Sequence, residues 1–159
     1  MGFAFGAAIL AGLIAGAIMA GPVYLQRAPG VDVKQGIFRT WGVPLRLHGA
    51  PGYLAGFLFH QALAAAITLV YALGFRVLGA TDHLWLWGLL GGALHHAIAG
   101  VVVDLLPAVH PEIPERIPVQ GAYYRNYGPL DVGTFITGYL TFELLVGLLY
   151  GLFTGGARP

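Results

Sequence analysis

The chain of 159 residues contains no cysteine and no serine. Without cysteine, disulfides, thiolate metal sites, iron–sulfur clusters, covalently attached c-type haem and palmitoylation are excluded within this sequence. Without serine there is no serine nucleophile. The sequence also lacks a glycine-rich phosphate loop, a nucleophile elbow and an HExxH run. These absences favour a non-enzymatic protein, and no residue is predicted to be catalytic.

Charge is scarce as well. Asp, Glu, Lys and Arg make up 9% of the chain, whereas soluble proteins carry roughly 25%. The net charge of +1 gives no electrostatic footprint for nucleic acid. Hydrophobic residues reach 57%, with a mean hydropathy of +0.74. The composition predicts an integral membrane protein that contacts the lipid bilayer and has no nucleic-acid partner.

Four long apolar runs account for most of the chain. Crossing the hydrocarbon layer takes about 20 apolar residues, and each run meets that length. The first run is too long and too poor in basic flanking residues for a secretory signal, so we expect it to be retained. We predict an all-α membrane protein in a single domain, residues 1–159, with two antiparallel hairpins built from helices at about 3–25, 53–78, 84–106 and 130–153.

The first long connection, between the first two predicted spans, contains apolar residues at helical spacing. Val33, Ile37, Phe38 and Trp41 recur with charged residues between them. This pattern is typical of a short amphipathic helix that lies in the membrane interface. We therefore predict a short interfacial helix within the first connection.

The second long connection lies between the third and fourth spans. Its repeated prolines predict an extended rather than helical chain. The segments His110-Pro111 and Tyr123–Gly128 are more polar and aromatic than a plain spacer requires. Long ordered loops are often functional, and a surface of aromatic residues and arginine suits a protein partner. Lipid headgroups are the alternative occupant of this surface.

The basic residues predict the orientation of the chain in the membrane. Arg76 and Arg158 belong to one side, and the two long connections on the other side hold six basic residues: Arg27, Lys34, Arg39, Arg46, Arg116 and Arg125. Cytoplasmic loops are enriched in Lys and Arg. We therefore expect both connections in the cytoplasm and both termini on the extracytoplasmic side of a bacterial inner membrane.

Small residues recur every four positions in the first and last spans. Such stripes let helix backbones approach closely, which drives helix association in lipid. They could serve the four-helix bundle itself, a second copy of the chain or another membrane protein. The residues are Ala8, Gly12, Gly16 and Ala20 in the first span, and Gly147, Gly151 and Gly155 in the last.

Ionisable residues inside the predicted spans are the main candidates for a functional site. The candidates are His60, His95, His96 and Glu143. A helix rises 1.5 Å per residue, so His60, His96 and Glu143 lie roughly 12, 16 and 20 Å from the cytoplasmic ends of their helices. These depths form a band near the middle of the membrane. A shared site is allowed by these depths. Asp104 lies nearer the interface, where solvation or an ion pair with a loop arginine is expected.

Small residues on the same helical faces would leave space beside the imidazoles. Gly56 precedes His60 by four positions, and Gly92 and Gly100 flank His96. One hypothesis is a haem b with His60 and His96 as axial ligands. Another is a transition metal held by His60, His95, His96 and Glu143. The same residues could instead form interhelical hydrogen bonds or line a pathway for protons or small solutes.

The assembled motifs resemble a group of small bacterial four-helix membrane proteins whose function is not characterised. The resemblance implies the four-helix topology and supports His60 and His96 as candidate site residues. It implies no activity. Its pattern has a histidine about where Glu143 stands, so a metal site would keep a ligand there with a different charge. The matching segments are 11–16, His60 with Tyr71-Ala72, His96 to His110-Pro111, Gly128-Pro129 and 149–151.

Taken together, these features favour a non-enzymatic membrane subunit that packs in a larger membrane complex of respiratory or photosynthetic type. Its expected partner is another membrane protein or a second copy of the chain. A small haem- or metal-binding membrane protein and a proton or solute pathway are the alternatives.

Overall fold

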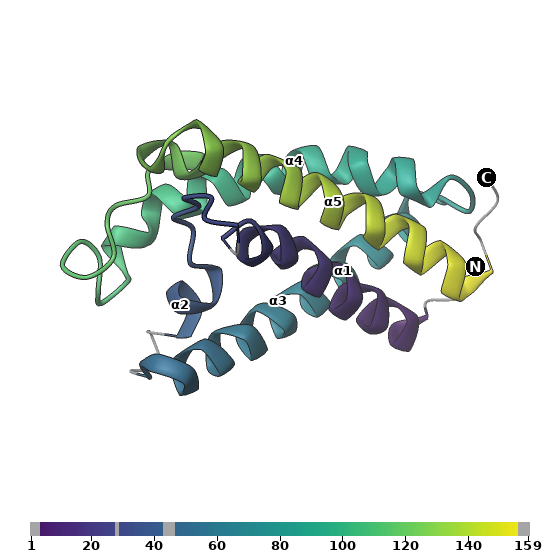
Figure 1. Cartoon of the computed structure of the whole chain (residues 1–159). Helices are drawn as coiled ribbons and strands as arrows, with labels where there is room; N and C mark the ends of the chain where they lie inside the picture. Colours follow the sequence, from purple (N-terminus) through teal and green to yellow (C-terminus); the bar gives the residue numbers. More distant parts are fainter. Residues whose placement is uncertain (1–3, 28, 43–46, 156–159) are drawn as a thin grey trace. The chain divides into compact units, whose positions relative to one another are not determined.

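The chain is helical throughout its regular structure, with no strand in the part described. The computed structural model describes residues 4–27, 29–42 and 47–155 (Figure 1). Arg46 and Arg158, and the predicted start of the first span at residue 3, lie outside these residues. Four helices are long and apolar enough to cross a membrane: α1 (Phe5–Leu25), α3 (Gly49–Val77), α4 (Leu84–Leu105) and α5 (Pro129–Thr154).

The prediction of four long apolar helices is confirmed. α3 begins at Gly49 rather than near residue 53, so Pro51 lies in its first turn. Proline is tolerated there because the N–H that it lacks would have no partner within the helix. α1 continues through Pro22 to Leu25. The pairing of the four helices as antiparallel hairpins stays a prediction.

Three shorter helices lie in the two long connections. α2 (Ile37–Gly42) lies between α1 and α3, and the 3₁₀ helices η2 (Leu106–Ala108) and η3 (Ala122–Tyr127) lie between α4 and α5 (Figure 1). The predicted short helix therefore exists, although Val33 precedes it. Its location in the membrane interface stays a prediction.

The expectation of an extended second connection is wrong. Residues 111–116 form turns, in which the backbone N–H groups of Arg116 and Ile117 both donate to the carbonyl of Glu112 at 2.9 Å. Proline fixes φ near −65°, a value that turns use as readily as extended chain does.

The chain divides into two compact units. The first unit comprises Met1–Met19, Gln61–Leu94 and Tyr139–Pro159, and the second comprises Ala20–His60 and His95–Gly138. Each long helix contributes residues to both units, and both long connections belong to the second. The single-domain prediction is not tested by this division.

Within the first unit, glycines of the predicted small-residue stripes pack against neighbouring helices. A Cβ atom at Gly12 would lie 2.7 Å from Thr68 Oγ1 and 2.8 Å from the Ala64 carbonyl of α3. A Cβ atom at Gly147 would lie 2.7 Å from Trp85 Cα of α4. At these positions the stripes therefore serve packing within the chain, where close backbone contact is what stabilises apolar helices in lipid.

Within the second unit, α2 lies directly on the first turns of α3. A Cβ atom at Gly56 would lie 2.9 Å from the Gly42 nitrogen and would collide with the Phe38 carbonyl. A Cβ atom at Gly42 would lie 2.7 Å from the carbonyl carbon of Gly52. Glycine at these positions is what lets the two backbones touch.

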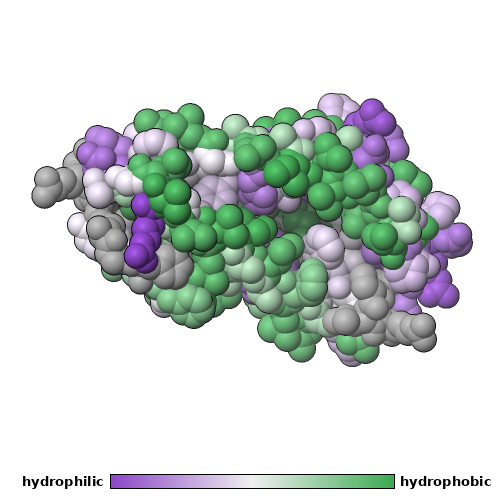
Figure 2. All heavy atoms as spheres, turned by 180° about the vertical axis from the view of Figure 1, so that it is seen from behind, coloured by the Kyte–Doolittle hydropathy of each residue, from purple (hydrophilic) through white to green (hydrophobic). Residues whose placement is uncertain are grey.

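The long helices also carry exposed apolar faces, and hydrophobic residues cover much of the face seen in Figure 2. On α4 the exposed side chains recur every three or four residues, so they form one helical face. An apolar face of this kind suits contact with lipid. Its residues are Leu86, Leu90, Leu94, Ile98, Val101 and Leu105.

Candidate functional site

The space predicted beside His60 is occupied by α2. His60 is buried on α3, with its ring 5.7 Å from the ring of Phe38 between centroids. The Phe38 ring also stacks on Tyr24 at 4.7 Å and meets Phe57 edge-on at 5.3 Å. The glycine stripe at Gly56 thus accommodates the backbone of α2.

His96 is likewise surrounded by aromatic side chains of its own unit. Its ring centroid lies 5.5 Å from that of Tyr123 and 5.2 Å from that of Phe135. A Cβ atom at Gly100 would lie 2.6 Å from Cδ1 of Tyr123. Tyr123 therefore fills the space that Gly100 leaves. His95, which directly precedes His96 on α4, is partly buried.

Glu143 belongs to the first unit, whereas His60, His95 and His96 belong to the second. The Glu143 side chain is fully buried and takes the place beside Gly92, where a Cβ atom would lie 2.5 Å from its Cγ. Among the described residues, no three His, Asp or Glu side chains form a group that could hold a metal ion. The haem and metal hypotheses stay predictions, without the open space on which they rested.

A different set of polar groups is assembled in the second unit, where the first connection meets the start of α5. The Asp131 side chain is 1% exposed, and its Oδ1 accepts hydrogen bonds from the backbone nitrogens of Lys34 at 3.0 Å and Gln35 at 2.8 Å. The Gln35 side chain donates to the Asp131 carbonyl. Arg27 donates to the carbonyls of Val33, at 2.8 Å, and Gln35. These contacts fix the first connection against α5.

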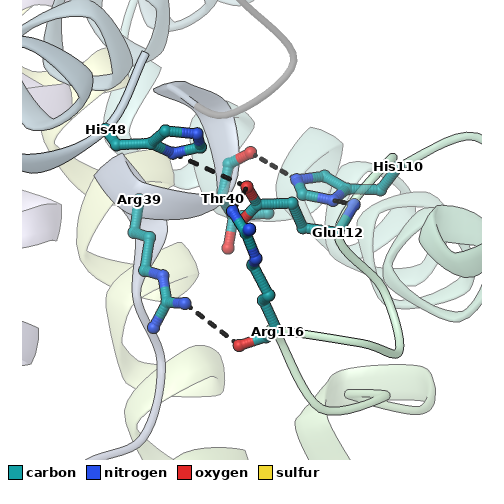
Figure 3. A network of polar contacts seen from close by, with 6 residues as sticks. All are labelled: Arg39, Thr40, His48, His110, Glu112 and Arg116. Carbon is teal, nitrogen blue, oxygen red and sulfur yellow. Dashed lines mark hydrogen bonds and ion pairs between the residues drawn. The ribbon is translucent and has the colours of Figure 1, made fainter. Parts of the chain in front are cut away.

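His110 joins the second connection to α2 (Figure 3). It is buried, and its Nδ1 lies 3.2 Å from the backbone nitrogen of Glu112. A backbone N–H can only donate, so Nδ1 is the acceptor and carries no proton. The ring proton is then on Nε2, which donates to the Thr40 carbonyl at 2.9 Å. The sequence singled out His110, but nothing in the pattern indicated Thr40 as its partner.

Next to His110 lies a cluster of charged side chains (Figure 3). Arg39 Nη2 donates to the Arg116 carbonyl at 3.0 Å, and Arg116 Nη1 donates to Glu112 Oε1 at 3.2 Å. His48 Nδ1 lies 3.5 Å from the same carboxylate oxygen. The Glu112 side chain is 11% exposed, whereas those of Arg116 and His48 are 66% and 58% exposed. A shielded carboxylate therefore holds two more accessible basic side chains.

These charged side chains line a cavity of about 330 Å³ in the second unit. Small-molecule sites in proteins have volumes of roughly 300–1,000 Å³, so the cavity is at the lower end of that range. It combines basic, acidic, aromatic and glycine residues. The lining residues are Arg39, Leu47, His48, Gly49, Gly52, Tyr53, Glu112 and Arg116.

The tyrosine-rich segment before α5 is partly core and partly surface. Tyr124 is buried, whereas Arg125 and Asn126 are exposed. Tyr123 and Tyr124 have left-handed backbone conformations, with φ of +55° and +60°, which residues other than glycine seldom adopt. Burial raises the pKa of Tyr127 above its ordinary value, so its phenol keeps the proton that it donates to the Pro118 carbonyl at 2.9 Å. The predicted partner surface is thus an ordered structure.

Sequence reasoning missed His48, Glu112 and Asp131 as candidates. The only local signal was the four-residue spacing of Glu112 and Arg116, which favours an ion pair on one turn of helical chain. The other contacts join residues far apart in the sequence, such as Arg39 with Arg116. No periodicity in a single sequence indicates contacts of that kind.

Comparison of the chain with protein families, curated proteins and solved structures finds no match. The resemblance to small bacterial four-helix membrane proteins therefore stays a prediction. The arrangement of the chain's own side chains is the basis on which a function is assigned.

Proposed function

We propose that the chain is a non-enzymatic integral membrane subunit that contacts a partner in a larger membrane complex through an ordered polar layer. The polar layer is defined as the described residues of the two connections, within 26–48 and 106–128. The four apolar helices anchor this layer to the bilayer. Complexes of respiratory or photosynthetic type are the proposed setting.

The observation that carries the proposal is the fixation of both connections by buried polar contacts. Asp131 holds the first connection on α5, and His110 holds the second on α2. Ordering backbone costs about 1–2 kcal/mol per residue, which contacts of this kind have to offset. A chain that only linked four spans would not need these contacts.

The chemistry of the exposed part of the layer supports a protein partner. Arg125 and Asn126 are exposed beside the aromatic residues of η3. Aromatic residues and arginine are enriched at protein–protein interfaces. A rigid surface of these residues also avoids the entropic cost of ordering a loop on binding.

The proposal is tested by isolating the full chain, produced at its natural level with an affinity tag, from native membranes in mild detergent. Native electrophoresis and mass spectrometry then identify the proteins that migrate with it. We expect other membrane proteins in a fixed stoichiometric ratio. A chain that migrates only as a monomer or only with copies of itself contradicts the proposal.

Two charge-reversal variants test whether the partner binds the polar layer or another part of the surface. Arg125 is exposed in the polar layer, and Arg76 is exposed at the end of α3. We expect Arg125→Glu to abolish co-purification with the partner, because it places a negative charge on the proposed interface. Arg76→Glu should leave the partner bound. Equal behaviour of the two variants would exclude the polar layer as the interface.

A further inference from the structure

We propose that the cavity in the second unit is a binding site for a phosphate group. The cavity lies wholly within residues of one compact unit. This inference goes beyond the proposed role as a subunit, because it concerns the isolated chain and requires no protein partner.

The charges that line the cavity favour an anion. Arg39 and Arg116 carry permanent positive charge, and Glu112 is the one carboxylate among the described residues that line the cavity. His48 adds an imidazole whose Nδ1 lies 3.5 Å from that carboxylate. Since Glu112 compensates one guanidinium, the lining keeps an excess of positive charge that a bound anion would balance.

The geometry of the donors favours an oxyanion over a simple halide. A guanidinium presents five N–H groups in a planar fork that matches the oxygens of phosphate. In the contacts described here, Arg39 uses Nη2 and Arg116 uses Nη1, which leaves further N–H groups on each fork for a ligand. Two forks on one cavity offer enough N–H groups to bind several oxygens of a tetrahedral oxyanion.

The backbone at the start of α3 adds to this preference. Gly49 and Gly52 line the cavity, and α3 begins at Gly49. A helix N-terminus carries partial positive charge, although Pro51 has no N–H and the N–H of Gly52 donates to the His48 carbonyl at 3.3 Å, so the contribution here is mainly electrostatic. A Cβ atom at Gly49 would have no atom within 4 Å, so there is open space beside this residue.

The remaining lining residues indicate that the phosphate belongs to a larger, partly apolar molecule. Leu47 and Tyr53 are 40% and 43% exposed at the cavity. They offer apolar surface next to the basic side chains. Both a phospholipid headgroup and a soluble phosphate ester present a phosphate beside carbon atoms, so the experiment has to distinguish these two sources.

Glu112 sets the affinity of the site in this proposal. Its carboxylate is shielded from solvent and already accepts a hydrogen bond from Arg116. A phosphate bound to the remaining N–H groups of Arg116 would lie near this carboxylate, whose negative charge repels a second anion. Replacing Glu112 by glutamine removes the repelling charge while keeping the shape, so the variant should bind phosphate more tightly than the wild type.

The test measures binding to the full chain, purified and delipidated in non-ionic detergent, by isothermal titration calorimetry. The probes are dihexanoyl phosphatidylglycerol and glycerol 3-phosphate, and dihexanoylglycerol is the control without phosphate. We expect saturable binding of at least one phosphate probe and none of the control. Binding of phosphatidylglycerol alone identifies a headgroup site, and binding of glycerol 3-phosphate identifies a site for soluble esters. Absence of binding for both phosphate probes overturns the proposal.

Matched variants then locate the site. We expect Arg39→Gln and Arg116→Gln each to weaken binding about tenfold or more, since hydrogen bonds to charged groups carry that much affinity. Arg76→Gln, an exposed arginine outside the cavity, should bind as the wild type does. Glu112→Gln should bind several times more tightly, a gain that a folding defect would not produce. Unchanged affinity in the two cavity variants, or no gain in Glu112→Gln, overturns the proposal.

Discussion

At the scale of single residues, the second unit depends on a few buried polar groups that accept hydrogen bonds from backbone nitrogens. The carboxylate of Asp131 is the clearest case, because it accepts from two consecutive N–H groups of the first connection. A buried donor without an acceptor is costly. The side chain of Asp131 therefore stabilises the first connection mainly by accepting these two hydrogen bonds.

We predict that Asp131→Ala lowers the free energy of unfolding by about 1–3 kcal/mol, because the buried N–H of Gln35 loses its acceptor. Thermal unfolding in detergent, followed by circular dichroism, measures the change. Asp32→Ala is the control, since Asp32 is 84% exposed and lies 4.0 Å from Lys34. An exposed pair of this kind contributes little. Equal destabilisation by the two substitutions would contradict this role of Asp131.

His110 provides a second prediction at this scale. Because Nδ1 accepts from Glu112 and Nε2 donates to Thr40, the imidazole should be neutral with its proton on Nε2. Nitrogen-15 chemical shifts of the labelled side chain distinguish the two ring nitrogens. A spectrum with the proton on Nδ1 would show that the contact between the second connection and α2 is wrongly assigned.

For the helices, the sequence indicated which faces pack closely but not which neighbouring segment contacts each face. The stripe of Gly56 and His60 predicted open space, and the structure fills that space with α2 and its Phe38 ring. Periodicity reports which face of a helix carries small residues. The identity of the neighbour depends on long-range contacts, here between α2 and α3, which no local pattern encodes.

We predict that Gly56→Ala lowers the thermal stability of the chain, because the added methyl group meets the backbone of α2 at Phe38 and Gly42. Overpacking of this kind costs about 1–3 kcal/mol. Gly74→Ala on the same helix is the control, since a Cβ atom there has nothing within 4 Å. Replacing glycine by alanine inside a helix stabilises it by up to about 1 kcal/mol. If both substitutions changed the melting temperature in the same direction, the contact between α2 and α3 would be refuted.

At the scale of the whole molecule, hydropathy and length predicted the four long helices, and their limits were correct to within a few residues. Apolar runs of this length have few alternatives to a helix in lipid, since every backbone group must find its partner within the segment. The turns of the second connection were not predicted, because proline fits turns as well as extended chain, and because the contact of His110 with Thr40 joins residues far apart in the sequence. Sequence patterns therefore identified the long helices and the polar segments of both connections, but not the contacts that hold these segments in place.

In the proposed function, four spans anchor one polar layer, formed by both long connections, on a single side of the membrane. The chain has no cysteine, so single cysteines can be introduced at Val31 and Val119 in the two connections and at Thr81 between α3 and α4, all of them exposed. Labelling with a membrane-impermeant maleimide in intact cells and in inverted vesicles reports the side on which each cysteine lies. We expect Val31→Cys and Val119→Cys to react only from the cytoplasmic side and Thr81→Cys only from the opposite side. Reaction of the Val31 and Val119 variants from different sides would contradict this arrangement.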